Sequence, residues 1–238
     1  MSTAPALEIR NLGRRYGPIA ALDGLDLTLD AGRIVALFGE NGSGKTTLLK
    51  IVAGLLSEYT GEALIHGHAP GPESKAMVSF LPDQSFLPDT VSARTAVSMF
   101  GDFFADFDAA RAFALIAELG IDAHRTLKTL SKGQREKVQL ALAMSRRARI
   151  YLLDEPISGV DPAAREVILR TILTQYDPGA LVVISTHLIA DIEAVADAAV
   201  FLRAGRVLFA GDADDLRARH GMSLDRLFRT TYQNPVRS

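Results

Sequence analysis

A run of eight residues between an apolar segment and a helical one has the composition of a phosphate-binding loop. It reads Gly39-Glu40-Asn41-Gly42-Ser43-Gly44-Lys45-Thr46. The glycines let the backbone wrap around an anion with its N–H groups turned inward, and the positive end of a helix attracts the same anion. In this pattern Lys45 reaches the outer phosphates and the Thr46 hydroxyl can ligate Mg²⁺. The run therefore predicts binding of a polyphosphate together with Mg²⁺.

Two adjacent carboxylates follow a second apolar run. Residues 150–153 read Ile-Tyr-Leu-Leu, and Asp154 and Glu155 come directly after them. At the end of a strand beside the phosphate loop, Asp154 can hold Mg²⁺ directly or through water. Glu155 can polarise an attacking water molecule. An acidic turn can follow any strand, but the phosphate loop in the same chain favours the catalytic interpretation.

A third candidate is the stretch Leu130-Ser131-Lys132-Gly133-Gln134, which precedes a helical pattern. Ser131 and Gly133 would lie at the start of that helix, where an anion can bind. The same residues also fit an ordinary serine cap with a loop glycine. From these residues alone, both interpretations stay open.

The elements that must position these residues alternate between strands and helices. Strands are predicted by period-2 or fully apolar patterns, and helices by 3.6-residue periodicity and by glycine or proline at their ends. Strands are expected at 7–10, 25–29, 34–38, 62–66, 77–81, 150–153, 181–185, 199–202 and 206–209, and helices at 46–53, 163–176 and 188–195. A Pro/Gly-rich turn is expected at 69–72, and two short helices around Gly221 in 212–238.

Residues 92–148 interrupt this alternation with helical patterns only. Phe100, Phe103, Phe104 and Phe107 follow the i, i+3, i+4, i+7 spacing of one apolar helix face. Helices are also expected at 111–119, before Gly120, and at 134–147. This block is predicted to be a helical insertion in an α/β core.

Composition excludes several classes of protein. The 238 residues include no cysteine, which excludes disulfides, thiolate metal sites and thiol catalysis. The 26 basic and 28 acidic residues nearly balance, which argues against nucleic acid as a partner. No apolar run reaches the length of a membrane-spanning helix, and the first five residues show no secretory signal.

The full set of motifs resembles the nucleotide-binding subunit of ATP-binding-cassette (ABC) transporters, in that family's order over residues 7–210. The phosphate loop matches its Walker A motif, residues 150–155 its Walker B motif, and residues 130–134 its signature motif. Residues 158–161, Ser-Gly-Val-Asp, resemble its D-loop. His187 matches its switch histidine, and Tyr16 falls where the family stacks an aromatic ring on adenine.

The resemblance implies ATP and Mg²⁺ as cofactors and assigns three kinds of site residue. Catalytic roles fall to Glu155, His187 and Lys45, and the metal would be held by Thr46, Asp154 and Gln84. Nucleotide contacts are expected from Tyr16, Gly39, Asn41, Gly42, Ser43, Gly44, Lys45, Thr46, Thr47, Gln84, Ser131, Gly133, Gln134 and Asp161. Taken without the resemblance, Tyr16 also fits an ordinary strand-edge aromatic residue and Asp161, before Pro162, a helix cap.

The chain departs from the family pattern at two places. Lys132 stands where the signature usually has glycine. In the Q-loop the family usually has glutamine directly after the strand and its proline, whereas here Pro82 is followed by Asp83 and then by Gln84. Either the loop shifts its register by one residue or Asp83 takes the role, and both possibilities stay open.

The fold that the resemblance implies is an α/β P-loop NTPase, with a RecA-like core sheet, an antiparallel β-subdomain and an inserted α-helical signature subdomain. The core with its β-subdomain would comprise residues 1–84 and 149–210, the helical subdomain 85–148 and a short helical tail 211–238.

The implied function is that of an ATP-hydrolysing subunit. Two subunits, identical or paralogous, would dimerise head to tail around two ATP molecules. They would drive a separate transmembrane permease, expected to be of the export type, from the cytoplasmic face of the cell membrane. The phenylalanine stripe is either the core of the helical subdomain or a floor for the permease.

The alternatives come from other classes. A non-transport ABC ATPase of translation or DNA repair would usually carry two cassettes in one chain or long coiled coils, and neither is visible here. An unrelated P-loop GTPase or kinase would lack the signature motif, and the chain has no Asn-Lys-x-Asp motif for guanine.

Overall fold

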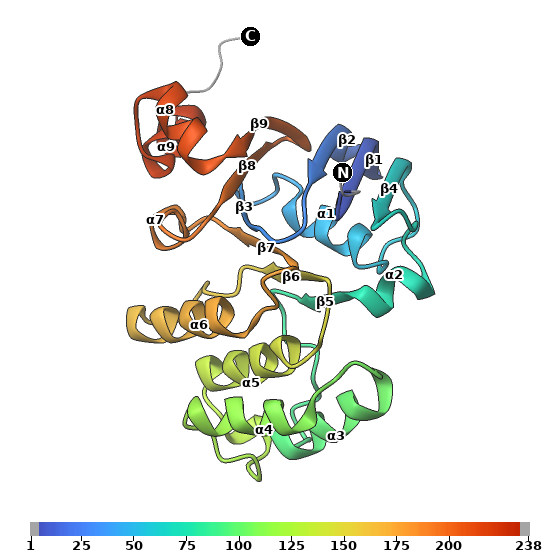
Figure 1. The fold of residues 1–238 in the computed structure, drawn as a ribbon, viewed down its shortest axis with the longest axis vertical. Helices are drawn as coiled ribbons and strands as arrows, with labels where there is room; N and C mark the ends of the chain where they lie inside the picture. Colours follow the sequence, from blue (N-terminus) through green and yellow to red (C-terminus); the bar gives the residue numbers. More distant parts are fainter. Residues whose placement is uncertain (1–4, 234–238) are drawn as a thin grey trace.

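The computed structural model describes residues 5–233 and shows two sheets, a helical lobe and a helical tail (Figure 1). The strands are β1 (Leu7–Tyr16), β2 (Ile19–Leu29), β3 (Ile34–Phe38), β4 (Thr60–Ile65), β5 (Val78–Leu81), β6 (Ile150–Asp154), β7 (Leu181–Thr186), β8 (Ala198–Arg203) and β9 (Arg206–Asp212). The α-helices are α1 (Lys45–Val52), α2 (Pro72–Met77), α3 (Ala93–Phe103), α4 (Ala109–Glu118), α5 (Lys132–Met144), α6 (Pro162–Gln175), α7 (Ile189–Ile192), α8 (Ala213–His220) and α9 (Leu224–Gln233). Within 5–233, every helix is too short or too polar to cross a bilayer.

The larger sheet has the strand order β5-β6-β7-β3-β8-β9. All neighbours pair in parallel except β8 and β9, which pair antiparallel across a tight turn. Every residue of β3 and β6 is buried, because helices cover both faces of a parallel sheet. The registers Phe38↔Thr186 and Asp154↔Ser185 align the carboxyl ends of β3, β6 and β7. The predicted fold class is confirmed.

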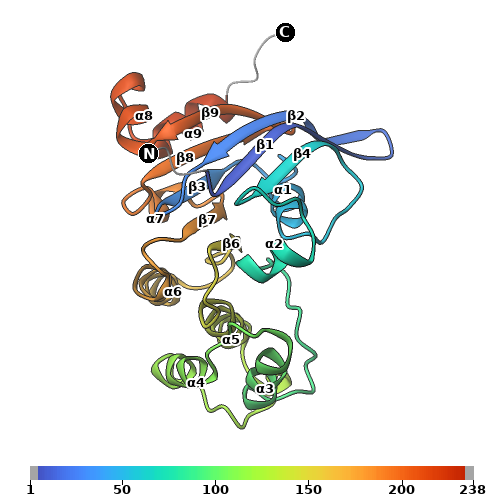
Figure 2. The same ribbon diagram turned by 45° about the vertical axis from the view of Figure 1, so that its right-hand side comes forward.

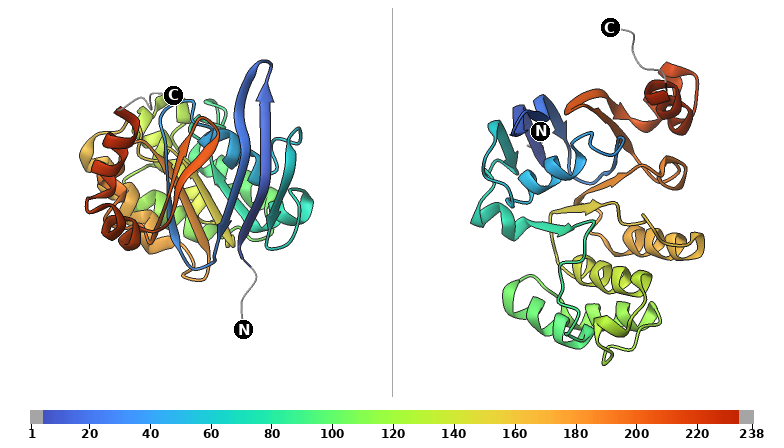
Figure 3. Two further views of the ribbon diagram at one scale, coloured as in Figure 1. Left: turned by 90° about the horizontal axis from the view of Figure 1, so that it is seen from above. Right: turned by 180° about the vertical axis from the view of Figure 1, so that it is seen from behind.

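The smaller sheet is antiparallel, with the order β2-β1-β4. Helix α1 lies between this sheet and the larger one (Figure 2). Its residues Leu48, Leu49 and Ile51 pack into one core with Leu7 and Ile9 of β1. The β1–β2 hairpin extends beyond the rest of the sheet, as the view from above in Figure 3 shows.

Helices α3, α4 and α5 form a lobe at one end of the molecule, at the bottom of Figure 1. Leu115 and Ile116 of α4 pack with Val97 of α3 and with Val138 and Ala141 of α5. Among the described residues of 92–148 there is no strand, as predicted.

The prediction of one helix face for the four phenylalanines is wrong. Helix α3 ends at Phe103, which is 77% exposed, and the backbone of Phe104 is already extended. The Arg146 guanidinium lies 4.0 Å from the Phe104 ring centroid, and its Nε donates to Asp106 at 2.8 Å. These tertiary contacts fix 104–107 as a loop, so the helical spacing of the sequence does not continue in the structure. The rings of Phe104 and Phe107 still meet that of Phe100, at 5.3 and 5.5 Å.

Two other helix predictions are corrected. The Pro/Gly stretch contains the expected turn, at Pro70 and Gly71, but it leads into a helix that the sequence did not predict, because Pro72 takes the first position of α2 and the Ser74 hydroxyl accepts from the Gly71 N–H at 2.8 Å. Met77, predicted in a strand, ends that helix. The helix predicted at 188–195 is only the four residues of α7, because 193–197 already turn back toward β8.

Candidate functional site

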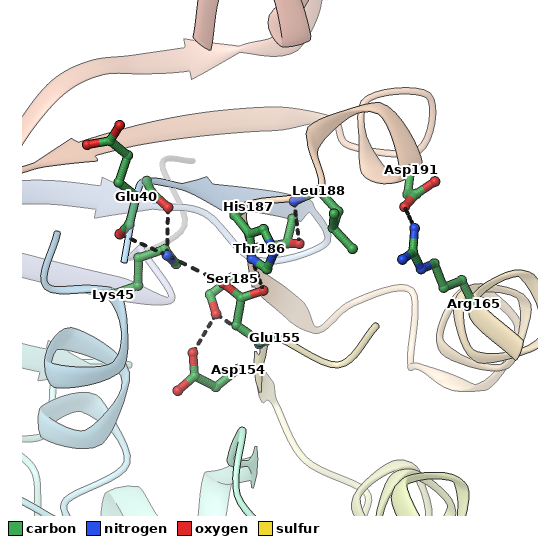
Figure 4. A network of polar contacts seen from close by, with 11 residues as sticks. Glu40, Lys45, Asp154, Glu155, Arg165, Ser185, Thr186, His187, Leu188 and Asp191 are labelled. Carbon is green, nitrogen blue, oxygen red and sulfur yellow. Dashed lines mark hydrogen bonds and ion pairs between the residues drawn. The ribbon is translucent and has the colours of Figure 1, made fainter. Parts of the chain in front are cut away.

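The predicted catalytic side chains meet at the carboxyl ends of β3, β6 and β7 (Figure 4). Lys45 begins α1 just after β3, Asp154 ends β6 and Glu155 follows it, and His187 follows β7. Three segments far apart in the sequence are thus brought together by strand register. This edge is where open parallel sheets bind their ligands.

The loop before α1 has the tight geometry that its glycines predict. A Cβ on Gly39 would lie 2.3 Å from Ser43 Oγ and 2.6 Å from Leu202 O, so only glycine fits. Gly42 and Gly44 have φ of 82° and 108°, which L-residues rarely adopt. Asn41 and Gly42 are exposed at the rim.

Lys45 is 6% exposed and lies back across its own loop. Its Nζ donates to Gly39 O at 2.7 Å and to Glu40 O at 3.3 Å. It also lies 3.4 Å from Glu155 Oε1, an ion pair without hydrogen-bond geometry, so this buried oxygen has no hydrogen-bond donor among the described residues. The Lys45 ammonium group therefore lies beside the Glu155 carboxylate, at the centre of the site.

Asp154 is 1% exposed and is held by Ser185. The Ser185 hydroxyl donates to Asp154 Oδ1 at 2.5 Å, while the buried Oδ2 has no hydrogen-bond partner within residues 5–233. A buried carboxylate oxygen is costly without a donor or a cation. Asp154 therefore has one oxygen fixed in place and one free for a cation.

Glu155 is positioned by its backbone. Its φ of 50° is unusual for a residue with a side chain, and its N–H donates to both Ser185 O and Ser185 Oγ, at 3.0 and 3.1 Å. These bonds hold the turn that carries the carboxylate into the site. Glu155 Oε2 lies 2.9 Å from His187 Nδ1, so the histidine ring is oriented by the carboxylate.

Thr46 and Thr47 occupy the first turn of α1, with Thr46 exposed and Thr47 half-buried. Together with Asp154 Oδ2 and the buried Ser43 hydroxyl, neither of which has a partner in the described part of the chain, they supply the hard oxygen donors that Mg²⁺ prefers. The donor set therefore fits Mg²⁺ with a polyphosphate. Among residues 5–233, no cluster of three or more histidine, cysteine or acidic side chains forms a self-contained metal site.

Tyr16 ends β1 and is 44% exposed. The Arg14 guanidinium lies 4.7 Å from the ring centroid, and its Nη1 bonds to Glu58 Oε2 at 2.9 Å. The tyrosine therefore projects from the smaller sheet with an accessible aromatic surface.

The signature residues belong to the helical lobe. Ser131 caps α5, its Oγ accepting from Gln134 N at 3.2 Å while Gln134 Oε1 accepts from Ser131 N at 3.0 Å. Ser131 both caps α5 and is exposed, so the motif fits a helix cap and an anion-binding helix start at the same time. Lys132 Nζ lies 3.6 Å from Glu136 Oε1 and 2.6 Å from where a Cβ of Gly159 would be. The lysine thus lies against the D-loop of its own chain.

The remaining predicted residues lie around this centre. Asp83 and Gln84 are both exposed in the loop after β5. Asp161 caps α6, accepting from Ala164 N at 3.0 Å, with Pro162 in the first helical position. The cap is therefore observed, and the nucleotide contacts of Asp161 and Gln84 stay predictions.

Sequence reasoning missed Ser185. It fixes Asp154 through its hydroxyl and Glu155 through both of its oxygens. The available signal was the change from Val182, Val183 and Ile184 to Ser185 and Thr186 at the end of a buried strand. A polar residue in such a position must find a partner.

Comparisons with known proteins agree with this geometry. The family model described as ABC transporter matches residues 22–158. A candidate ABC transporter ATP-binding protein of Halobacterium salinarum is 36% identical over 220 residues, covering 89% of this chain and 95% of that protein. A daunorubicin resistance ATP-binding protein of Streptomyces coeruleorubidus is 30% identical, covering 91% of this chain and 71% of that protein.

Solved structures share the fold. An ATP-binding subunit of an ABC transporter matches with a TM-score of 0.85 and 29% identity, covering 94% of this chain and 98% of its own. A dimeric ATP-binding cassette in a post-hydrolysis state with ADP and Pi matches with a TM-score of 0.76 and 23% identity, covering 87% and 98%.

Proposed function

We propose, from the premise that this chain belongs to the ABC transporter family, that it binds and hydrolyses ATP with the residues at the carboxyl edge of its larger sheet. The observation that carries the proposal is the network around Glu155, whose carboxylate contacts Lys45 and His187 and whose backbone N–H shares Ser185 with Asp154 (Figure 4). As a member of this family the chain is an ATPase subunit.

Each residue has a distinct task in the reaction. The backbone of 39–44 and the start of α1 bind the phosphates, and Lys45 exchanges its bonds to Gly39 O and Glu40 O for the outer phosphates. Thr46 and Asp154 Oδ2 would hold Mg²⁺, which when bound would neutralise negative charge on the phosphates. Gln84 is an additional proposed ligand in the loop after β5, and Asp83 is the alternative.

Glu155 orients and polarises the water that attacks the terminal phosphate. Its Oε1 has no hydrogen-bond donor among the described residues, so this oxygen can accept a water proton. His187 holds the other oxygen at 2.9 Å and so fixes the carboxylate plane. On the adenine side, the ring of Tyr16 supplies a stacking surface.

A complete site needs a second copy of the chain or a paralogue. Ser131, Gly133 and Gln134 stand at the start of α5, and among the described residues the side chains of Ser131 and Gln134 bond only within their capping box. In the dimer they would close over the ATP that the other subunit holds, adding a helix terminus and donors to the terminal phosphate. Asp161 and its D-loop would line the same interface. A related cassette is dimeric with ADP and Pi.

We propose a separate transmembrane permease as the second partner, which would place the subunit on the cytoplasmic face of the membrane. An ABC cassette with no spanning helix in its described residues needs such a partner to move cargo. The daunorubicin resistance relative favours export as the direction. The proposed subunit divides into 1–84 with 149–210 as core, 85–148 as helical subdomain and 211–238 as tail, and residues 1–4 and 234–238 of these ranges lie outside the described residues.

The test of ATP hydrolysis is Glu155→Gln. We expect ATP binding to persist, an ATP-bound dimer to accumulate, and turnover to fall by about 10³-fold, because the variant cannot take a proton from water. Glu166→Gln, on the exposed face of α6, is the matched control and should turn over normally. Full turnover by Glu155→Gln would refute the role of Glu155.

The test of permease coupling is Phe103→Asp. Phe103 is 77% exposed at the end of α3, so the change costs little folding stability. We expect basal ATPase activity to persist while transport, measured with the co-purified permease in vesicles, is lost. Unchanged transport would exclude this end of α3 from the docking surface.

A further inference from the structure

The C-terminal helices pack against elements that adjoin the site at the carboxyl edge of the larger sheet. Helix α9 packs against α7 and α8, and α8 against β8 and β9. Figure 1 shows α8 and α9 beside these elements, at the end of the molecule away from the helical lobe. The tail thus packs against α7, which follows His187, and against β8 and β9.

The first connection runs from α9 to the phosphate loop. The buried hydroxyl of Tyr232 donates to Leu202 O at 2.8 Å. A Cβ on Gly39 would lie only 2.6 Å from that carbonyl oxygen, so the carbonyl packs directly against the start of the phosphate loop. The next turn of the chain holds the same loop, because Gly205 N donates to Ser43 O at 3.0 Å.

Tyr232 is itself held firmly. Its ring is stacked on Phe228, with centroids 4.2 Å apart, and the Arg203 guanidinium lies 5.7 Å from the centroid while its Nη1 donates to Thr231 O. Burial, with a further contribution from the charge of Glu40, raises the pKa of Tyr232 far above its usual value. The hydroxyl therefore stays a donor at any working pH.

The second connection runs from the tail to the segment after His187. Glu193 directly follows α7 as its C-cap, six residues after the histidine, and its two carboxylate oxygens accept from Leu224 N and Asp225 N at 3.1 and 3.0 Å. It thereby caps the start of α9, where a carboxylate is favourable. Arg217 of α8 contacts the same carboxylate at 3.6 Å.

We propose that α9 is a brace that positions two parts of the site, the phosphate loop and the His187 segment. Tyr232 acts on the phosphate loop through Leu202, and Glu193 acts on the His187 segment through α7. Both are positioning residues, because neither touches the reacting atoms. The inference rests on the proposed ATPase site.

The brace predicts a split between binding and turnover. Tyr232→Phe removes one hydrogen bond behind Gly39 and should weaken ATP binding about fivefold with turnover at saturating ATP unchanged. Glu193→Gln leaves one acceptor for two N–H groups and should lower turnover about fivefold with ATP binding unchanged.

The matched control is Tyr151→Phe. Tyr151 is also buried, and its hydroxyl also donates to a main-chain carbonyl, Arg146 O at 2.7 Å, but near the start of β6 and toward the helical lobe. The control should lower the melting temperature as Tyr232→Phe does, without changing the dissociation constant for ATP.

The experiment uses the full chain and measures the ATP dissociation constant by calorimetry, turnover, melting temperature and amide hydrogen exchange. Faster exchange confined to 39–46 in Tyr232→Phe and to 187–192 in Glu193→Gln supports the brace. The brace is overturned if both variants lower the melting temperature but match the Tyr151→Phe control in local exchange, in the ATP dissociation constant and in turnover. Loss of turnover in Glu155→Gln alongside that result would leave the proposed function intact and refute the brace alone.

Discussion

The carboxyl edge of the larger sheet and the start of α5 both carry motif residues, but their surroundings differ. At the sheet edge Lys45, Asp154 and Ser185 are buried, Ser185 bonds to Asp154 between β7 and β6, and Lys45 pairs with Glu155 after β6. At the start of α5, Ser131 is exposed and its side chain bonds only within the capping box among the described residues. The first region is organised by this chain alone, whereas the second presents polar groups outward.

This difference indicates where the second subunit acts. Buried polar groups need partners inside the chain, and the sheet edge provides nearly all of them. The two exceptions on the carboxylates, Asp154 Oδ2 and Glu155 Oε1, point to a cation and a water molecule as ligands. The exposed cap of α5 presents the N–H groups of a helix start, and the first turn of this helix carries no acidic residue.

Of the two predictions that compare these regions, the one with the larger effect concerns the second region. Ser131→Ala should lower turnover about 10²-fold, because it removes a contact to the terminal phosphate across the dimer. Its effect on the stability of the isolated chain should be only the loss of a helix cap, about 1 kcal/mol.

Ser92→Ala is the matched control for this prediction, since Ser92 caps α3 in the same lobe and accepts from Thr95 N at 3.1 Å. Denaturant unfolding should show similar losses of stability for both variants, and an ATPase assay should separate them. Equal turnover in the two variants would remove the distinction between the two regions.

A smaller effect is expected at the sheet edge from Ser185→Ala. The change leaves Asp154 Oδ1 without its donor, which should cost about 1–3 kcal/mol of unfolding free energy. Turnover should fall about tenfold, and the Mg²⁺ concentration for half-maximal activity should rise, because the carboxylate is no longer fixed.

Thr171→Ala provides a control for Ser185→Ala, since the Thr171 hydroxyl donates to Val167 O within α6, away from the site. Unfolding curves and Mg²⁺ titrations of both variants make the comparison. An unchanged Mg²⁺ dependence in Ser185→Ala would show that Asp154 is held by the strand backbone alone.

The sequence predicts the parts of the site that depend on local pattern. The phosphate loop is identified because glycines, lysine and threonine stand at fixed spacing between a buried strand and a helix. The strands β3, β6 and β7 were predicted from their apolar runs, and Asp154 from its place at the end of one of them.

What the sequence does not reveal depends on register and on tertiary contacts. Ser185 acts only because the parallel pairing sets it opposite Asp154. The phenylalanine spacing predicts a continuous helix, but the contacts of Arg146 with Phe104 and Asp106 fix residues 104–107 as a loop. Tyr232 reaches Leu202 from 30 positions away, and no local pattern marks that contact.

The most direct test mixes two inactive variants, Lys45→Ala and Ser131→Arg. In a head-to-tail dimer of the two, one site carries both changes and the other carries neither. We predict negligible ATPase activity for each variant alone, and roughly a quarter of the wild-type rate for an equal mixture, since about half of the dimers are mixed and each has one intact site. An equal mixture as inactive as its components would contradict the account, because it would mean that the sheet edge and the start of α5 do not complete each other across two chains.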